Sequence, residues 1–528
     1  MSQAVVAIAG ATGFVGTAIR NSLLEQFTVR GLTRSAYKLS HPDPNDPVQW
    51  VHCNAYSASS VEQALKGADY LVYLIHSMVP SSRLTQASFQ DLDLLLADNF
   101  AQGAKAAGLK QILYVGGLMP DDESEEASKH LSSRYEVEQV LQASGVPVTS
   151  LRCGVIVGPG GSSLRILINL VRRLPIMGLP TWTWSQTQPV AIQDVLKAVK
   201  LCLGEQEKYS GSFDIGGPDL MTYKDMMQIT AEEMGKNRWM FPFPFVTLGI
   251  SKRWVSTISN SSQALVSPLV DSLRHDLRAK PNPLQDQLIS SAVTFRESVS
   301  ASMDEHGFPL QNPRQELKRE DQQMIREQRR VRSVQRLPLP PGRDARWALE
   351  EYVRWLPQFL KPFLRCDVLE DGRVLFCLRF LSTPLLDLRL RQGGDEHRKV
   401  LDIIGGLLAD TQESQEGRLE FREVFDGKYV IAAIHDFCPS LPWYIYNATQ
   451  AVAHLFVMNA FGRHLARICE APAVAVANVE PSAKGGPVFF QTGVVSCSCK
   501  AERTACPITV SARDRVKSPS RSISDLST

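Results

Sequence analysis

Ala4-Val5-Val6-Ala7-Ile8-Ala9 is an apolar run of strand length, and Gly10-Ala11-Thr12-Gly13-Phe14-Val15-Gly16 follows it directly, before a helix-like segment at residues 17–24. In such a strand–turn–helix unit the first glycine permits the tight turn, the second lets the backbone approach a ligand, and the third lets the helix pack closely. The helix start also presents free N–H groups to an anion. The stretch therefore predicts a cradle for a dinucleotide pyrophosphate, built from Gly10, Thr12, Gly13, Phe14, Val15 and Gly16.

The first half of the chain alternates strand-like and helix-like segments, which is typical of an α/β protein. Beyond the first strand, strands are expected at residues 28–33, 48–53, 69–75, 111–115 and 148–153, with helices at 61–66 and 89–107. Parallel strands joined by helices form a doubly wound sheet of the Rossmann type. The alternative is a glycine-rich turn in another α/β fold.

The residues after the second strand indicate which dinucleotide binds. A site specific for NAD(H) usually presents Asp or Glu there, to bind the ribose 2′-hydroxyl. Residues 30–38 contain no acid but do contain Arg34 and Lys38. A guanidinium can bind a 2′-phosphate through two hydrogen bonds. NADP(H) is therefore favoured over NAD(H), and the alternative is that both cations are ordinary solvated loop charges.

Several further segments resemble one known family. They are Leu74–Met78, Arg152–Gly160, Pro189–Val195 and Gly211–Gly217, which join the glycine turn. Together they make residues 4–235 similar to atypical short-chain dehydrogenases/reductases of the NmrA-like, complex-I-accessory-subunit-like and nucleoside-diphosphate-sugar epimerase-like branch. The resemblance, which also fits a bacterial subgroup with a fused C-terminal domain, implies an NAD(P)-binding site to which Ile75 and Gly116 add.

The catalytic set of that family is replaced in this sequence. Active members use a Tyr-x-x-x-Lys pair, in which the lysine lowers the tyrosine pKa, together with a serine. Here His130 stands at the tyrosine position, Arg134 at the lysine position, and Gly116-Gly117 where the serine is expected. Arginine stays cationic and could still hold a ribose or phosphate, while histidine could act as an acid near neutral pH.

Two main hypotheses follow from this replacement. In the first, the chain binds the cofactor without transferring hydride and serves as a redox sensor or assembly factor. In the second, it is an unorthodox reductase of an apolar carbonyl or enone that uses His130, His76 or Tyr135. A sugar-nucleotide epimerase is a third hypothesis. A structural reading of His76, as a strand-end histidine with an ordinary hydrogen bond, also stays open.

The rest of the chain is expected to form further parts. The predicted division is a Rossmann domain at 1–235, a helical substrate lobe at 236–303, a charged linker at 304–333, an α+β domain at 334–472 and a disordered tail at 473–528. Trp182 and Trp184 would line an apolar pocket or belong to the core. The α+β domain, with hairpins and one long helix at 442–471, resembles the helix-grip fold of polyketide cyclases and START proteins. That resemblance implies an apolar or lipid-like ligand; a purely structural domain is the alternative.

Bulk properties narrow the class of protein. The chain has 528 residues and a net charge of +2, which argues against a general nucleic-acid binder. No apolar run is long enough to span a bilayer, and no secretion signal precedes the first strand. Scattered cysteines favour a reducing, cytoplasmic location, and Cys497, Cys499 and Cys506 lack the spacing of a zinc site. Arg329, Arg330, Arg332 and Arg336 are expected to be solvated, with a peripheral membrane role as a weaker alternative.

Overall fold

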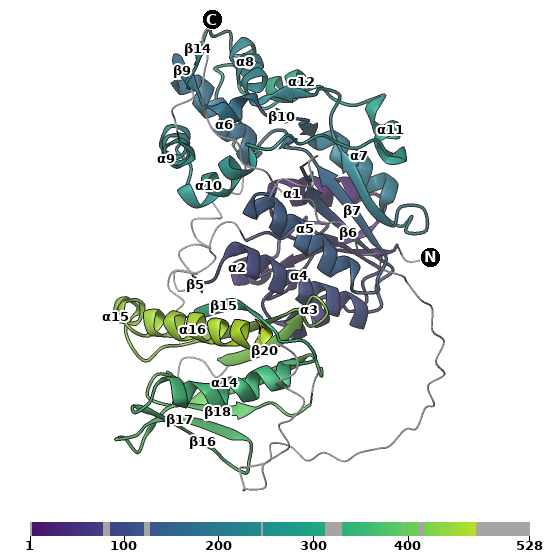
Figure 1. Cartoon of the computed structure of the whole chain (residues 1–528). Coiled ribbons are helices and arrows are strands. Elements are labelled where there is room, and N and C mark those ends of the chain that lie inside the picture. The colour runs from purple at the N-terminus through teal and green to yellow at the C-terminus, as the bar shows by residue number, and fades with distance from the viewer. Residues whose placement is uncertain are drawn as a thin grey trace, which may run out of the picture. The chain divides into compact units, whose positions relative to one another are not determined.

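The strand that precedes the glycine turn lies inside the first sheet. Figure 1 shows this sheet, in which β6 and β7 are labelled, between flanking helices. The computed structural model describes residues 3–77, 85–120, 127–243, 247–311, 330–393, 395–410 and 417–470. Residues Met1–Ala475 form one compact unit. The predicted tail and the cysteines at 497, 499 and 506 lie outside the described residues.

The described N-terminal residues form a seven-stranded parallel sheet in the order β12-β7-β6-β4-β1-β2-β3. Its strands are β1 (Val5–Ala9), β2 (Thr28–Thr33), β3 (Gln49–His52), β4 (Tyr70–Tyr73), β6 (Gln111–Gly117), β7 (Val148–Cys153) and β12 (Gly211–Ile215). The order changes direction at β1, which lies between β2 and β4, as in a doubly wound sheet. The predicted Rossmann-type fold class is confirmed.

Helices cover both faces of this sheet, because its strands are apolar on both sides. One face packs against α3 (Ala58–Leu65), α4 (Phe89–Ala106) and α5 (Lys129–Gln142), and the other against α1 (Phe14–Leu23), α7 (Ile192–Cys202) and α11 (Pro283–Ile289). The short helix α2 (Ala36–Ser40) follows β2. The predicted strand and helix positions differ from the observed ones by at most a few residues.

A smaller lobe is formed by segments that follow β7 and β12. It contains β8 (Ile156–Val157), α6 (Ser162–Arg173), β9 (Ile176–Leu179), a 3₁₀ turn (Thr181–Trp184), β10 (Gln186–Thr187), β11 (Val190–Ala191), β13 (Met221–Thr222), α8 (Tyr223–Glu233), β14 (Trp239–Pro242), α9 (Leu248–Ser259), α10 (Gln263–Ser272) and α12 (Phe295–Ser300). Trp182 is buried in its core against Tyr223, whereas Trp184 is exposed. Trp182 is therefore a core residue.

The second sheet has eight strands among the described residues, in the order β16-β17-β18-β19-β20-β21-β15-β5. They are β16 (Leu364–Val368), β17 (Arg373–Leu378), β18 (Pro384–Leu390), β19 (Arg398–Gly405), β20 (Arg418–Val424), β21 (Tyr429–Phe437), β15 (Val331–Pro338) and β5 (Thr85–Gln86). β19 was not predicted from the sequence. Residues 331–333 were expected to belong to the linker, whereas they begin β15.

Three helices accompany this sheet: α14 (Ala345–Phe359), α15 (Trp443–Ala448) and α16 (Gln450–Glu470). The Asp344 side chain caps α14 by accepting from the Trp347 N–H at 2.7 Å. The expected single helix at 442–471 is wrong, because it breaks at Thr449, whose hydroxyl donates to the Ile445 carbonyl. Tyr352, Phe421 and Phe461 pack between the sheet and the helices. The helix-grip resemblance and its apolar ligand stay predictions.

The two sheets are joined by a shared core and by ion pairs. Val334, Ile431 and Ala433 belong to the same apolar cluster as α3 and α4. Arg336 binds Asp91 and Glu136, and Arg332 is 8 % exposed. The prediction that Arg332 and Arg336 are solvated is therefore wrong, because β15 pairs on both sides and these side chains bind Asp436, Asp91 and Glu136. None of the described helices is long and apolar enough to cross a membrane.

Candidate functional site

The candidate site lies at the carboxyl edge of the first sheet, where β1 separates β2 from β4. Ligands of doubly wound sheets bind at this edge, at the point where the strand order reverses. The glycine turn follows β1, Arg34 follows β2, Ile75 and His76 follow β4, and Gly116 lies near the end of β6. The topology thus brings the predicted cofactor residues to one edge.

The glycine turn has the backbone geometry that a phosphate cradle needs. Gly10 has a φ of +94°, which favours glycine, and its carbonyl accepts from the Gly13 N–H at 2.9 Å. A Cβ atom on Gly16 would collide with that same carbonyl. The turn and the first turn of α1 are therefore packed backbone against backbone, and the residues present fit a pyrophosphate.

The first turn of α1 is left open to an anion. Gly13 is the N-cap residue, and within the described part of the chain no side chain caps the helix there. The first turn also carries no acid. The free N–H groups and the positive end of the helix dipole consequently face the sheet edge, with Thr12 and Val15 half-buried beside them.

Phe14 and Gly116 are both closely packed. Phe14 contacts the turn before α6, and Gly116 lies against the ring of Tyr114. A Cβ atom on Gly161 would lie 3.2 Å from the Phe14 ring, so this ring packs on the turn before α6. A Cβ atom on Gly116 would lie 2.8 Å from the ring of Tyr114, and the Tyr114 hydroxyl donates to the Arg134 carbonyl. The Tyr114 ring thus occupies the space that a side chain at position 116 would need.

Arg34 is exposed at the end of β2, as the NADP(H) argument requires. Its guanidinium carbon lies 5.8 Å from the centre of the Tyr56 ring. Lys38 lies over the Trp50 ring at 4.1 Å. Both cations that follow β2 thus lie beside an aromatic ring, Arg34 beside Tyr56 and Lys38 beside Trp50.

Arg134 is buried in an ion pair, which sequence reasoning did not anticipate. Its Nη2 donates to Asp93 Oδ2 at 2.8 Å, and the Ser133 hydroxyl donates to the same oxygen. The backbone N–H of Ser77 donates to Asp93 Oδ1 at 2.6 Å. Burial opposes the Arg134 charge, but Tyr114 and Asp93 outweigh it and raise the Arg134 pKa. Arg134 thus stays charged and is already neutralised by Asp93.

His130 lies one turn before Arg134 and close to His76. Burial, together with the Arg134 and His76 charges, lowers the pKa of His130 to about 3. Its Nδ1 has no hydrogen-bond partner among the described residues. The imidazole is consequently neutral at physiological pH, so it is not an imidazolium that could donate a proton to a substrate.

A cavity of about 580 Å³ that is open to solvent lies beside the ion pair, between the start of α4 and helix α10. Ser77, which donates to Asp93, connects the cavity to the ion pair. The cavity is lined by Ser77, Thr85, Ala87, Ser88, Phe89, Leu92, Gln263, Ala264, Ser267 and Pro268. Only the tertiary structure could reveal it, because α4 and α10 are far apart in the sequence. No cluster of metal-ligating side chains occurs in the described ranges.

Comparison with known proteins supports the cofactor class. Residues 10–168 match a family model described as NAD(P)H-binding. The N-terminal part of the chain is thus an NAD(P)H-binding domain. This match begins at the first glycine of the turn and ends within α6.

Two curated proteins resemble parts of the chain. The auxiliary protein GraX of Staphylococcus aureus is 26% identical over 119 residues, which are 22% of this chain and 38% of that protein. The 40 kDa subunit of the mitochondrial NADH-ubiquinone oxidoreductase of Neurospora crassa is 23% identical over 233 residues, which are 43% of this chain and 60% of the subunit. The chain thus matches less than two thirds of each relative.

Solved structures also align with the chain. A nucleoside-diphosphate-sugar epimerase from Staphylococcus aureus is 17% identical, with a TM-score of 0.45, over 56% of this chain and 100% of that one. The triphenylmethane reductase of Citrobacter sp., in complex with NADP(H), is 19% identical, with a TM-score of 0.44, over 56% of this chain and 98% of that one.

Proposed function

We propose that the chain binds NADP(H) at the carboxyl edge of the first sheet and reduces an electron-poor, conjugated acceptor bound in the cavity between α4 and α10. Gly10, Thr12, Gly13, Phe14, Val15 and Gly16 would hold the pyrophosphate, Arg34 the 2′-phosphate, and Ile75 and Gly116 the remaining cofactor. The observation that carries the cofactor part of this proposal is the exposed Arg34 at the end of β2, in a segment without acids.

The chemistry of the site limits the class of acceptor. Bound NADPH supplies a hydride. The described site offers neither a tyrosine–lysine pair nor a protonated histidine to deliver a proton, because Arg134 is paired with Asp93 and His130 is neutral. A quinone-like acceptor suits such a site, since its reduced oxygen can take a proton from water. A simple ketone, which needs an acid during hydride transfer, suits it poorly.

Arg34→Ala tests the cofactor assignment. We expect the variant to lose about tenfold in NADPH affinity and little in NADH affinity, because only NADPH carries the charged phosphate. Titration of the full-length protein with both nucleotides, followed by ligand fluorescence, measures the two dissociation constants. Equal affinities of the wild type for NADPH and NADH would contradict the assignment.

A second candidate function is a redox sensor that binds NADP(H) without turnover. The Asp93–Arg134 pair and the neutral His130 favour it, because both occupy positions that the resemblance links to catalysis. NADPH absorbance followed against quinones and carbonyls separates the two functions. Turnover with quinones supports the reductase, whereas tight binding without turnover supports the sensor.

A further inference from the structure

One short segment of the chain forms one wall of the cavity between α4 and α10. This segment is β5 with the start of α4, and it contributes the lining residues Thr85, Ala87, Ser88, Phe89 and Leu92. Helix α10 contributes four further lining residues, which are Gln263, Ala264, Ser267 and Pro268. The position of the β5–α4 segment relative to α10 therefore sets the shape of the cavity.

The strand β5 belongs to the second sheet, although α4, which follows it, covers the first sheet. It is two residues long, and among the described residues its only neighbour in the sheet is β15 (Figure 1). Thr85 pairs with Arg332 in this parallel ladder, and Gln86 pairs with Ser333. A strand of two residues has little stability by itself. The position of β5 therefore depends on β15.

Two side chains of β15 also bind the backbone of β5. Gln335 Nε2 donates to the Gln86 carbonyl at 3.0 Å, and the Ser333 hydroxyl donates to the same carbonyl at 3.3 Å. The Ser333 hydroxyl lies 3.1 Å from Nε2 of His454 in α16, so it is itself held in place. The C-terminal domain consequently fixes the chain just before it enters α4.

A third side chain of β15 binds the first turn of α4. Arg336 Nε donates to Asp91 Oδ1 at 3.0 Å, and Nη1 and Nη2 of Arg336 donate to the two Glu136 oxygens at 2.7 and 2.8 Å. Asp91 Oδ2 accepts from the hydroxyl of Ser88, the N-cap residue of α4, at 2.7 Å. Since Ser88 lines the cavity, Arg336 reaches the cavity wall through Asp91 and this cap.

We propose that β15 is part of the acceptor site, with Gln335 and Arg336 as positioning residues that hold the β5–α4 wall opposite α10. Neither side chain lines the cavity, so both act through the segment that they bind. The inference rests on the proposed function, which places the acceptor in this cavity. The glycine turn follows β1, which is not a neighbour of β15. The C-terminal domain thus determines acceptor binding, and NADPH binding is independent of these two residues.

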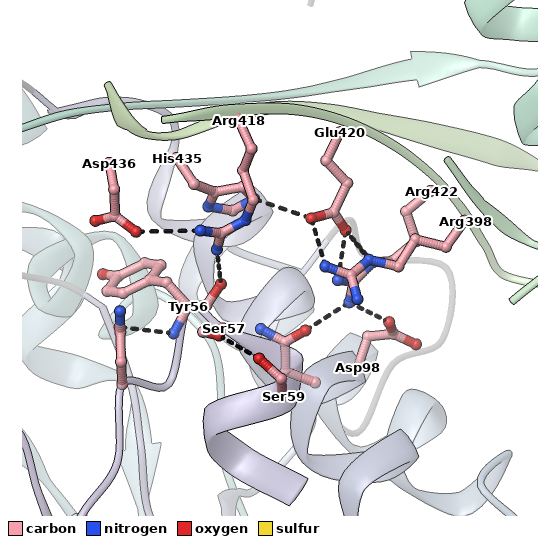
Figure 2. Close-up of polar contacts among 12 residues, drawn as sticks. Tyr56, Ser57, Ser59, Asp98, Arg398, Arg418, Glu420, Arg422, His435 and Asp436 are labelled. Carbon is pink, nitrogen blue, oxygen red and sulfur yellow. Dashed lines mark hydrogen bonds and ion pairs between the residues drawn. The ribbon is translucent and has the colours of Figure 1, made fainter. Parts of the chain in front are cut away.

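The test compares Gln335→Leu and Arg336→Gln with the control Arg422→Gln in the full-length chain. Arg422 also joins the second sheet to α4, but it donates to Asp98 at 2.6 Å (Figure 2), and Asp98 does not line the cavity. NADPH oxidation at varied 1,4-naphthoquinone concentrations gives the KM of the acceptor, and titration gives the dissociation constant of NADPH.

We expect Gln335→Leu and Arg336→Gln each to raise the naphthoquinone KM about fivefold and to change the NADPH dissociation constant less than about twofold, because each loses hydrogen bonds that fix only the acceptor wall. Arg336→Lys keeps a cation beside Asp91 and should recover part of the acceptor affinity. The Arg422 side chain is 5% exposed and that of Arg336 is 17% exposed. Arg422→Gln should therefore lower the melting temperature at least as much as Arg336→Gln and leave the naphthoquinone KM unchanged.

Melting of each variant reports on folding separately from acceptor binding. An unchanged naphthoquinone KM in folded Gln335→Leu and Arg336→Gln would overturn the role of β15 and leave the proposed function intact. An equal increase of the KM in Arg422→Gln would also overturn it, because any loosening between the two sheets would then suffice. If Gln335→Leu does not fold, Ser333→Ala decides, since it removes only the second donor to the Gln86 carbonyl. A wild type that binds NADPH but neither reduces nor binds naphthoquinone in equilibrium dialysis would overturn the proposed function and, with it, this role of β15.

Discussion

The glycine turn and the start of α5 lie at the same edge of one sheet, yet they treat charge in opposite ways. At the turn, Gly10 and Gly16 bring backbone together and leave the N–H groups of α1 without a capping side chain among the described residues. At α5, the charge of Arg134 is already matched by Asp93. The glycine turn is open to an anion from a ligand, whereas Arg134 already has an anionic partner within the chain, Asp93.

This difference separates cofactor binding from proton transfer. A phosphate cradle made of backbone survives changes of side chain, because it depends on the absence of Cβ atoms and on helix geometry. A proton relay depends on a few side chains and their pKa values. The chain has the backbone geometry of a phosphate cradle but lacks the tyrosine–lysine pair of the proton relay. The glycine turn therefore does not imply the reduction of carbonyl compounds.

Gly16→Val disrupts the packing of the glycine turn and should have the largest effect of the three variants. The new side chain would collide with the Gly10 carbonyl, so we expect a loss of about 4 kcal/mol or more of unfolding free energy and no measurable NADPH binding. Urea unfolding and nucleotide titration measure both. Gly249→Ala is the control, because a Cβ atom there meets nothing within 4 Å; equal stability of the two variants would contradict the close packing.

Asp93→Leu removes the acid that pairs with Arg134 of α5. Arg134 would keep its buried charge without a partner, and we expect a loss of about 3 kcal/mol of unfolding free energy. The double variant Asp93→Leu with Arg134→Met should recover most of this loss, since it removes both charges. Chemical denaturation of the four proteins completes the cycle. Additive losses in the double variant would show that the two residues do not form a pair.

His130→Gln tests the lowered pKa of His130 through the pH dependence of stability, and it should have the smallest effect of the three variants. The folded state lowers the His130 pKa from 6.5 to about 3. Protonation therefore favours the unfolded chain, and the stability present above pH 6.5 is lost as the pH falls toward 3. We expect His130→Gln to retain about 1–2 kcal/mol more of its neutral-pH stability at pH 5 than the wild type.

The control for this experiment is His306→Gln. The His306 side chain is 73% exposed, so this variant makes the same substitution on the protein surface. Urea unfolding at pH 7 and at pH 5 gives the comparison. A wild type and a His130→Gln variant that lose the same free energy between these two pH values would contradict the lowered pKa of His130.

Local patterns were sufficient for most of the first sheet and for parts of the second. Strands 28–33 and 148–153 were predicted with the bounds that the structure shows, and the expected hairpins of the second sheet include β20 and β21. β19 (Arg398–Gly405) was missed because Arg398, Lys399 and Asp402 interrupt its apolar pattern, whereas its pairing with β18 and β20 and the burial of Leu401 and Ile403 depend on distant segments. The solvated state expected for Arg332 and Arg336 was wrong for the same reason, since their acidic partners lie on distant segments.

The sequence by itself determined the strand, the glycine turn and the helix start of the proposed nucleotide cradle, because these elements lie within about the first twenty residues and need no distant partner. It also determined the loss of the tyrosine–lysine pair, which is a matter of residue identity. Only the tertiary structure decided that Arg134 is neutralised by Asp93, that a cavity adjoins Ser77, and that Arg332 reaches Tyr56. Burial and charge compensation depend on which segments meet in space, and no local pattern specifies that.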